Sequence, residues 1–210
     1  MTAYVTIPNG DVDPESPITT SLMVALRDNP TAITEGAVGA PEIAAAALVD
    51  ALQTWEHIQT NDITGAVATS DFSAVFDSTY DYYKMVIKGL NVSVDSDLVY
   101  LRFETGGSTW QTTGYGGASA TYMECFPNIG SAAGESGDAT VLIFKPSSAA
   151  EHTRLTSKSV ATTAAGTIGS HIIEAGYLSV TPVTGIRLYG SFGNLTLGVI
   201  SLYGMKYRGT

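Results

Sequence analysis

The residue types that usually carry enzymatic or metal chemistry are few and scattered in this chain. The three histidines, His57, His152 and His171, lie far apart, and no two of them have the spacing of metal ligands. A Ser-His-Asp triad is defined by geometry rather than by spacing, but no Gly-x-Ser-x-Gly motif marks a nucleophilic serine. The nearest Ser-His pair, Ser170 and His171, would point to opposite faces of a strand. The histidines therefore favour neither a zinc site nor a catalytic triad, and we expect no cofactor.

Carboxylate pairs are the second group with catalytic potential. Asp77 and Asp81, like Asp95 and Asp97, are close in sequence, but a glycosidase needs two facing carboxylates, one buried enough to stay protonated. Both pairs lie in predicted turns, where aspartate caps the backbone and remains solvated. The acidic segment 11–15 is slightly similar to a calcium loop, yet it lacks the glycine and the distal glutamate of an EF-hand. A solvated acidic arm is therefore favoured over a weak calcium site.

The single cysteine, Cys125, lies in an apolar, strand-like run and cannot form an intrachain disulfide. No His-Asn pair is evident that would make it a nucleophile, so we expect a buried, inert thiol. Together with the scattered histidines and the turn carboxylates, this predicts that the chain is not an enzyme.

The segment 106–117 is the most unusual stretch of the sequence, because it combines glycines with Trp110 and Tyr115. It has no phosphate-loop spacing. Aromatic side chains at a loop tip are typical of binding surfaces, so this segment is a candidate loop for binding a partner or receptor. The alternative is that both rings fold back and cover the core.

Charge is distributed unevenly along the 210 residues. The net charge is −10 and no run of basic residues occurs, so nucleic acid is not an expected partner. Residues 1–62 carry a net charge of −8 and residues 63–210 only −2, which predicts a boundary between an acidic arm and a second region. The sequence shows no signal-peptide pattern and no apolar run of about 18 residues. We therefore expect a soluble protein that is made in a cytoplasm.

The arm, residues 1–62, has two predicted helices. One begins at Ser16-Pro17 and ends at Asn29-Pro30, with Leu22 and Leu26 on its apolar face. The other spans residues 41–55, and its apolar face includes Leu48, Leu52 and Trp55. The first helix is too short to be stable alone in water. These apolar faces are therefore candidates for docking onto a partner or for assembly of copies of the chain, with packing on the chain's own second region as the alternative.

From about Thr64 the apolar period changes from helical to two-fold, which predicts strands. Turn clusters separate them, and no helical pattern intervenes. Nine or ten strands with regular turns favour a β-sandwich or barrel, and a jelly-roll-like sandwich over residues 63–210 is the natural prediction at this length. The predicted strands are Ala66–Ser70, Ala74–Phe76, Tyr82–Leu90, Leu98–Glu104, Ala120–Phe126, Thr140–Lys145, Arg154–Thr162, His171–Leu178, Gly185–Tyr189 and Leu197–Tyr207.

The N-terminal segment also suggests a family. The run Asp-Pro-x-Ser-Pro-Ile-Thr at residues 13–19, followed by Leu-Arg-Asp-Asn-Pro at 26–30, resembles N-terminal segments of virion proteins from tailed bacteriophages. The resemblance covers residues 4 to about 43, and the run 76–87 looks like an early strand of phage β-sandwich domains. It implies a subunit that attaches to other virion proteins through its N-terminal segment, displays a β-sandwich outward and assembles, as such proteins often do, as a homotrimer. It offers no catalytic residues.

Three functional hypotheses follow. The first is a virion subunit of tail-fibre or receptor-binding type, made in the host cytoplasm, whose loop at 106–117 faces a host-surface glycan or protein. The second is a capsid decoration or cement protein, in which the same arm binds the shell. The third is a free carbohydrate-binding module, which leaves the acidic arm unexplained. An enzyme acting on polysaccharide comes last, because the sequence shows no buried acidic pair.

Overall fold

A computed structural model describes residues 23–25, 55–117 and 119–206 of the chain. The chain divides into two compact units, residues 1–52 and 53–210. Of the first unit only residues 23–25 are described, and they are helical. Most of the two predicted helices, including Leu22, Leu26, Leu48 and Leu52, therefore lies outside the described residues. No helix in the described part is long and apolar enough to cross a bilayer.

The second unit is built from antiparallel strands, which confirms the prediction of a mainly β fold. Its strands in chain order are β1 (Glu56–Ile63), β2 (Thr69–Phe72), β3 (Tyr82–Val92), β4 (Asp97–Thr105), β5 (Thr109–Trp110), β6 (Tyr115–Gly116), β7 (Met123–Ile129), β8 (Gly137–Phe144), β9 (Thr153–Thr162), β10 (Ile168–Tyr177), β11 (Val183–Gly190) and β12 (Leu195–Met205).

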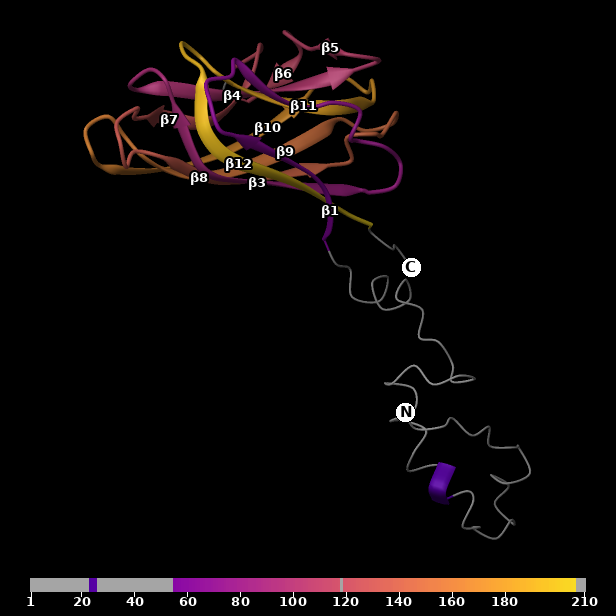
Figure 1. Cartoon of the computed structure of the whole chain (residues 1–210). Coiled ribbons are helices and arrows are strands. Elements are labelled where there is room, and N and C mark those ends of the chain that lie inside the picture. Colours follow the sequence, from indigo (N-terminus) through magenta and orange to yellow (C-terminus); the bar gives the residue numbers. More distant parts are fainter. Residues whose placement is uncertain (1–22, 26–54, 118, 207–210) are drawn as a thin grey trace, which may run out of the picture. The chain divides into compact units, whose positions relative to one another are not determined.

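The strands form two curled sheets (Figure 1). One sheet has seven strands in the order β1-β12-β3-β8-β9-β10-β6, and the other has the order β2-β11-β4-β5, with β7 also paired to β4. The inner faces of both sheets contribute to one hydrophobic core. Strand β3 shows how the sequence produces this arrangement. Tyr83, Met85 and Ile87 alternate with partly exposed residues, because successive side chains of a strand point to opposite faces.

The strand register defines two ends of this unit. At the proximal end the chain enters at Glu56, which pairs with Gly204 shortly before the chain leaves the sheet. The neighbouring strands continue this end of the sheet. Met205 pairs with Tyr82, and Tyr82 pairs with Phe144. From Phe144 the pairing continues through β9 and β10 to β6. At the opposite, distal end lie the turns between β3 and β4, β7 and β8, β9 and β10, and β11 and β12.

Strand β1 differs from the sequence prediction. It begins at Glu56, so the predicted boundary at residue 62 falls inside a strand that pairs with β12 over its whole length. Its sequence, EHIQTNDI, is mostly polar and lacks two-fold alternation, which is tolerated because β1 lies at the edge of its sheet. The predicted strand at 74–76 is also absent. Ala74 has a positive φ of 53°, a conformation outside the β region.

Candidate binding surfaces

Tyr115 is a core residue, which overturns the prediction that it is displayed for binding. Only 4% of it is exposed. Its hydroxyl accepts a hydrogen bond from the backbone N–H of Phe103 (2.8 Å) and donates one to the carbonyl oxygen of Gln111 (3.1 Å). Burial is the main reason that the pKa of the phenol is raised. The alternative reading of segment 106–117, a ring folded back onto the core, therefore describes Tyr115.

Trp110 remains partly exposed at the edge of the five-stranded sheet. The turn that precedes it contains Gly106 and Gly107, whose positive φ values of 51° and 86° glycine adopts without strain. The guanidinium carbon of Arg187 lies 4.2 Å from the centre of the indole ring, within the range of a cation–π contact. Arg187 is held in turn by two 2.7 Å hydrogen bonds to the carboxylate of Asp71. Trp110 is thus a fixed part of a sheet face, and its role in binding stays a prediction.

The strand registers give the position of segment 106–117, the candidate binding loop, within the second unit. The segment follows the proximal end of β4, and β6 within it pairs with the last residues of β10. It therefore lies at the end of the second unit where the chain enters and leaves.

Trp55, the one predicted docking residue whose side chain is described, lies on the outer face of the seven-stranded sheet. The ammonium of Lys84 is 4.6 Å from the centre of its ring and 5.3 Å from that of Tyr203. Tyr203 in turn packs edge-on against His57. Trp55 is in neither a helix nor a strand, so the predicted helix does not extend to it.

The proximal end of the same outer face contains a groove of about 720 Å³. Its walls combine apolar and charged side chains from neighbouring strands, a combination typical of ligand pockets. Residues that line it include Tyr82, Phe144, His152, Arg154, Glu174 and Leu178. The rings of Tyr82 and Phe144 meet edge to face, with their centres 5.7 Å apart.

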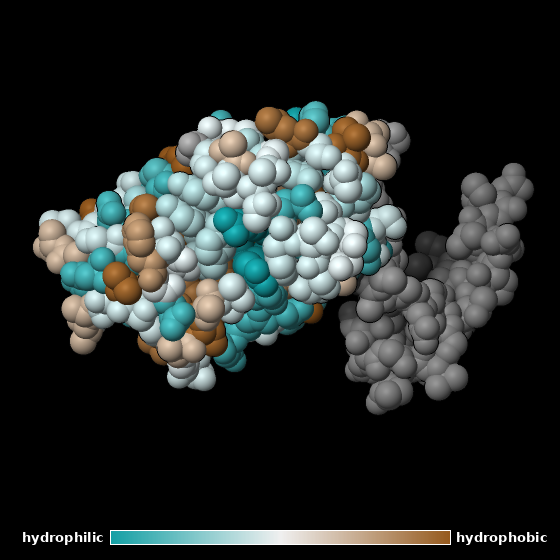
Figure 2. Space-filling view, turned by 90° about the horizontal axis from the view of Figure 1, so that it is seen from above, coloured by the Kyte–Doolittle hydropathy of each residue, from teal (hydrophilic) through white to brown (hydrophobic). Residues whose placement is uncertain are grey.

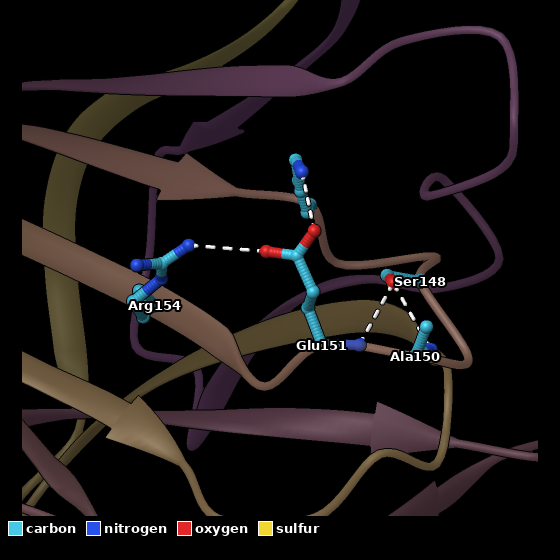
Figure 3. Close-up of polar contacts among 5 residues, drawn as sticks. Ser148, Ala150, Glu151 and Arg154 are labelled. Atoms are coloured by element: carbon cyan, nitrogen blue, oxygen red, sulfur yellow. Dashed lines mark hydrogen bonds and ion pairs between the residues drawn. The ribbon is translucent and has the colours of Figure 1, made fainter.

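Glu151 organises the rim of this groove (Figure 3). Its carboxylate pairs with the ammonium of Lys145 and, at 3.3 Å, with the guanidinium of Arg154, while its N–H donates to the hydroxyl of Ser148. The hydrogen bond to Lys145 lowers the pKa of Glu151 and raises that of Lys145. These groups are exposed, so they order the rim without adding much stability.

A second hollow, of about 750 Å³, lies further along the same face. Val86, Val160 and Ile172 line it together with Lys158 and Asp138. Ile172 is 66% exposed. The outer face of the seven-stranded sheet thus presents apolar side chains between charged ones.

Asp97 organises the turns at the distal end and corrects the prediction of a solvated aspartate. It is completely buried, and its carboxylate accepts hydrogen bonds from the N–H groups of Leu98 (2.9 Å), Phe192 (2.9 Å) and Gly193 (3.0 Å). It therefore caps the backbone, as expected for aspartate in a turn. Its neighbour Asp95 accepts the N–H of Ser131 and so joins a further turn to this end.

Phe192 is the surface residue that sequence reasoning missed. Asp97 holds its backbone, while its side chain is 75% exposed. Val94, in the turn between β3 and β4, is 40% exposed and packs near Gly193. The signal was available in the run Gly190-Ser191-Phe192-Gly193-Asn194, an aromatic residue set in a tight turn.

The groups first considered for catalysis are separated or buried. Ser170 is exposed on the outer face of β10, whereas His171 points to the other side, where its Nε2 lies 3.5 Å from a carboxylate oxygen of Glu124. Cys125 is fully buried, with its sulfur 3.7 Å from the hydroxyl of Ser157. Burial raises the pKa of this thiol to about 12. The described residues contain no cluster of three or more His, Cys, Asp or Glu arranged to hold a metal ion.

Comparison with protein-family models and with curated proteins returned no match.

Proposed function

We propose that this chain is a non-catalytic virion subunit of a tailed bacteriophage, of tail-fibre or receptor-binding type. Its N-terminal segment attaches to other virion proteins, and its second unit is a β-sandwich that presents a binding surface to a host-surface glycan or protein. The resemblance of residues 4 to about 43 to phage virion proteins motivates the virion context. The geometry of the β unit supports separate roles for its two ends, with the chain connections at the proximal end and the binding surface at the distal end.

The strand order supports a jelly-roll sandwich. The strands β1-β12-β3-β8 lie in one sheet and β2-β11-β4-β7 contribute to the other, while the hairpin β9–β10 extends the first sheet. A chain that alternates between two four-stranded sheets in this order is a jelly roll, an architecture found in viral capsid and lectin domains. That architecture hosts many functions, so it supports the proposal only as a scaffold.

One observation supports the display of a binding surface by the distal turns. Because β1 enters and β12 leaves at the proximal end, the distal turns are the part of this unit most remote from both chain connections. Those turns are braced by Asp97 and present the exposed ring of Phe192. An exposed aromatic on a rigid backbone is suited to binding, because little conformational entropy is lost when a partner covers it.

The first test concerns the virion. Tailed-phage particles whose genome encodes this chain are purified and digested for mass spectrometry, and antibodies against the β unit locate it by immunogold electron microscopy. We expect peptides of this chain in the particle and label on the tail. Absence of the chain from washed particles would overturn the proposal, and label on the head would favour the capsid decoration hypothesis instead.

The second test concerns the division between the two ends. Deletion of residues 1–54, which keeps β1 intact, should leave a folded β unit that binds host cells but no longer joins the particle. In the full chain, Phe192→Ser should weaken binding to cells and Leu178→Ser, an exposed residue of the proximal groove, should not. The reverse result would move the receptor site to the groove. That outcome would favour the hypothesis of a carbohydrate-binding module.

The solution mass of the full chain tests the predicted homotrimer. Light scattering at two protein concentrations should give three times the chain mass of 21.9 kDa at both. A monomer at both concentrations would contradict the trimer prediction.

A further inference from the structure

The outer face of the five-stranded sheet carries a network of aromatic and charged side chains. The alternation of each strand brings these residues to one side, and the registers of β2, β11, β4 and β7 place them next to each other. In Figure 2, which looks onto the molecule from the side of β4 and β11, strongly hydrophilic residues form a band across the middle, surrounded by residues of intermediate hydropathy. The network consists of Asp71, Tyr100, Arg102, Trp110, Tyr122, Glu124, Arg187 and Tyr189.

Two arginines lie directly opposite each other in this network. Arg187 of β11 is the register partner of Arg102 of β4, and like charges in this position destabilise a sheet. Asp71 neutralises Arg187 through two short hydrogen bonds. Among the described residues Arg102 forms no ion pair, and its Nε donates only to the carbonyl oxygen of Thr121, at 3.3 Å. One guanidinium therefore has donors to spare and no counter-charge.

Tyr189 supplies a second donor at the same place. The guanidinium carbon of Arg102 lies 4.7 Å from the centre of its ring. Its buried hydroxyl oxygen has the guanidinium of Arg102 as its polar neighbour, but its O–H proton has no acceptor in the described part of the chain. A buried donor without an acceptor costs free energy and calls for an explanation. An acceptor placed beside Arg102 and the Tyr189 hydroxyl would satisfy both groups.

We infer that this face binds a carboxylated saccharide of the uronic-acid type, with the sugar carboxylate held by Arg102 and Tyr189. Arginine is well suited to a carboxylate because its planar donors match the two oxygens. The surrounding rings suit the sugar itself, because the C–H groups of a pyranose pack against aromatic faces. Trp110 lies beside Arg187 on one side, and Tyr100 and Tyr122 stack with their centres 3.8 Å apart on the other.

The charges of the face favour a sugar over an acidic peptide. Asp71 and Glu124 lie on the same face, and Arg102 is the only arginine of the network without a carboxylate partner among the described residues. One carboxylate is therefore attracted, whereas a run of several would be repelled by the two protein carboxylates. This inference goes beyond the proposed function, because it concerns the isolated chain and does not require a virion.

The test is binding of a glucuronate-containing oligosaccharide to the full chain, measured by isothermal titration calorimetry, with a neutral glucose oligosaccharide of equal length as the comparison. We expect the acidic sugar to bind and the neutral one to bind far more weakly. Arg102→Gln should weaken binding about 10- to 100-fold, as expected for loss of hydrogen bonds to a charged group. Lys206→Gln, which removes an exposed positive charge outside this network and outside both hollows of the other sheet, is the matched control and should leave binding unchanged.

Tyr189→Phe is the second variant, because it removes only the hydroxyl and keeps the ring beneath Arg102. We expect it to fold with an unchanged melting curve or better and to bind several-fold more weakly. Equal binding of acidic and neutral oligosaccharides would overturn the role of the carboxylate. Tighter binding of a hexaglutamate peptide would replace the sugar with an acidic protein partner. No binding of either saccharide at millimolar concentration would overturn the inference, whatever the particle experiments show.

Discussion

The proximal and distal ends of the β unit order their loops with different chemistry. At the proximal end tyrosine hydroxyls hold the backbone: Tyr115 bonds to Phe103 and Gln111, and Tyr83 both accepts from and donates to the backbone of Asp77. At the distal end carboxylates do so, with Asp97 accepting three backbone N–H groups and Asp95 one more.

The length of the loops at each end explains this difference in hydrogen bonding. The proximal loops are long, and their rings extend the core between the sheets, so burial and hydrogen bonding are achieved by the same side chain. The distal turns are short and cannot fold back, so their N–H groups need an acceptor brought from the strand end. The proximal loops are therefore held by phenols as well as by carboxylates, such as Glu104 and Asp77, which accept the N–H groups of Ala74 and Thr79. The distal turns rely mainly on carboxylates.

Truncation of Tyr115 should give the largest effect. Tyr115→Ala removes a buried ring and leaves the N–H of Phe103 without its partner. We expect a loss of about 3–5 kcal/mol in the free energy of unfolding, comparable to other large-to-small core substitutions. Urea denaturation followed by circular dichroism measures it. Tyr115→Phe keeps the ring and should cost about 1–3 kcal/mol. If Tyr115→Ala lowered the free energy of unfolding by less than Tyr115→Phe does, the core position of Tyr115 would be contradicted.

Removal of the distal carboxylate should have the next largest effect. Asp97→Ala deprives three backbone N–H groups of their acceptor in a fully buried position. We expect a loss of about 2–4 kcal/mol, since each unsatisfied donor carries a desolvation cost. Hydrogen exchange should accelerate at the amides of Phe192 and Gly193 but not at Phe103. Equal acceleration at both ends would show that the two ends are not ordered independently.

Alkaline pH should weaken the proximal loop between β2 and β3. The hydrogen bond to Glu56 raises the pKa of Tyr80 to about 12, and burial raises that of Tyr83 to about 12, both from 10.0. Because the folded state keeps these protons longer than the unfolded state, their stabilisation is complete below about pH 10 and is lost as pH rises towards 12. We expect a melting temperature that falls over this interval. The phenolate absorbance of these tyrosines should appear at a higher pH in the folded protein than in the unfolded chain.

The β3–β4 and β7–β8 turns supply the control for this titration, because no tyrosine of the described chain lies in them. Tyr100, whose pKa burial also raises to about 12, instead contacts Ser191 in the β11–β12 turn. Between pH 10 and 12 the backbone signals of Asp95 and Ser131, followed by nuclear magnetic resonance, should change later than those of Asp77 and Glu56. Simultaneous change at both ends would mean global unfolding and would remove the distinction.

The sequence predicted the strands whose alternation reflects a buried inner face. Strands β3 and β9 were expected within two residues of their ends, since their side chains alternate between the core and the outer face. Strand β1 was missed because its polar side chains suit an edge, where hydrogen bonding to β12 rather than apolar burial defines the strand. The two-residue strands β5 and β6 leave no periodic signal at all.

The candidate binding residues were harder to predict than the strands. Trp110 and Tyr115 are five residues apart in one glycine-rich segment, and nothing in the sequence distinguishes them. Their environments differ because Tyr115 joins the seven-stranded sheet by pairing with Tyr177 and is buried in the core, while Trp110 lies at the edge of the five-stranded sheet. The pairing of Arg102 with Arg187 likewise depends on strand order, which local patterns do not contain.

Trp110→Ala should therefore have the smallest effect of these changes, although it lies in the same proximal segment as Tyr115. The ring is partly exposed and makes a cation–π contact with Arg187, an interaction worth about 0.5–1 kcal/mol at exposed sites. We expect a loss of that size in urea denaturation, with Arg187 still held by Asp71. A loss equal to that of Tyr115→Ala would place Trp110 in the core as well. It would also mean that the proximal end is ordered by the segment as a whole rather than by the tyrosine hydroxyl.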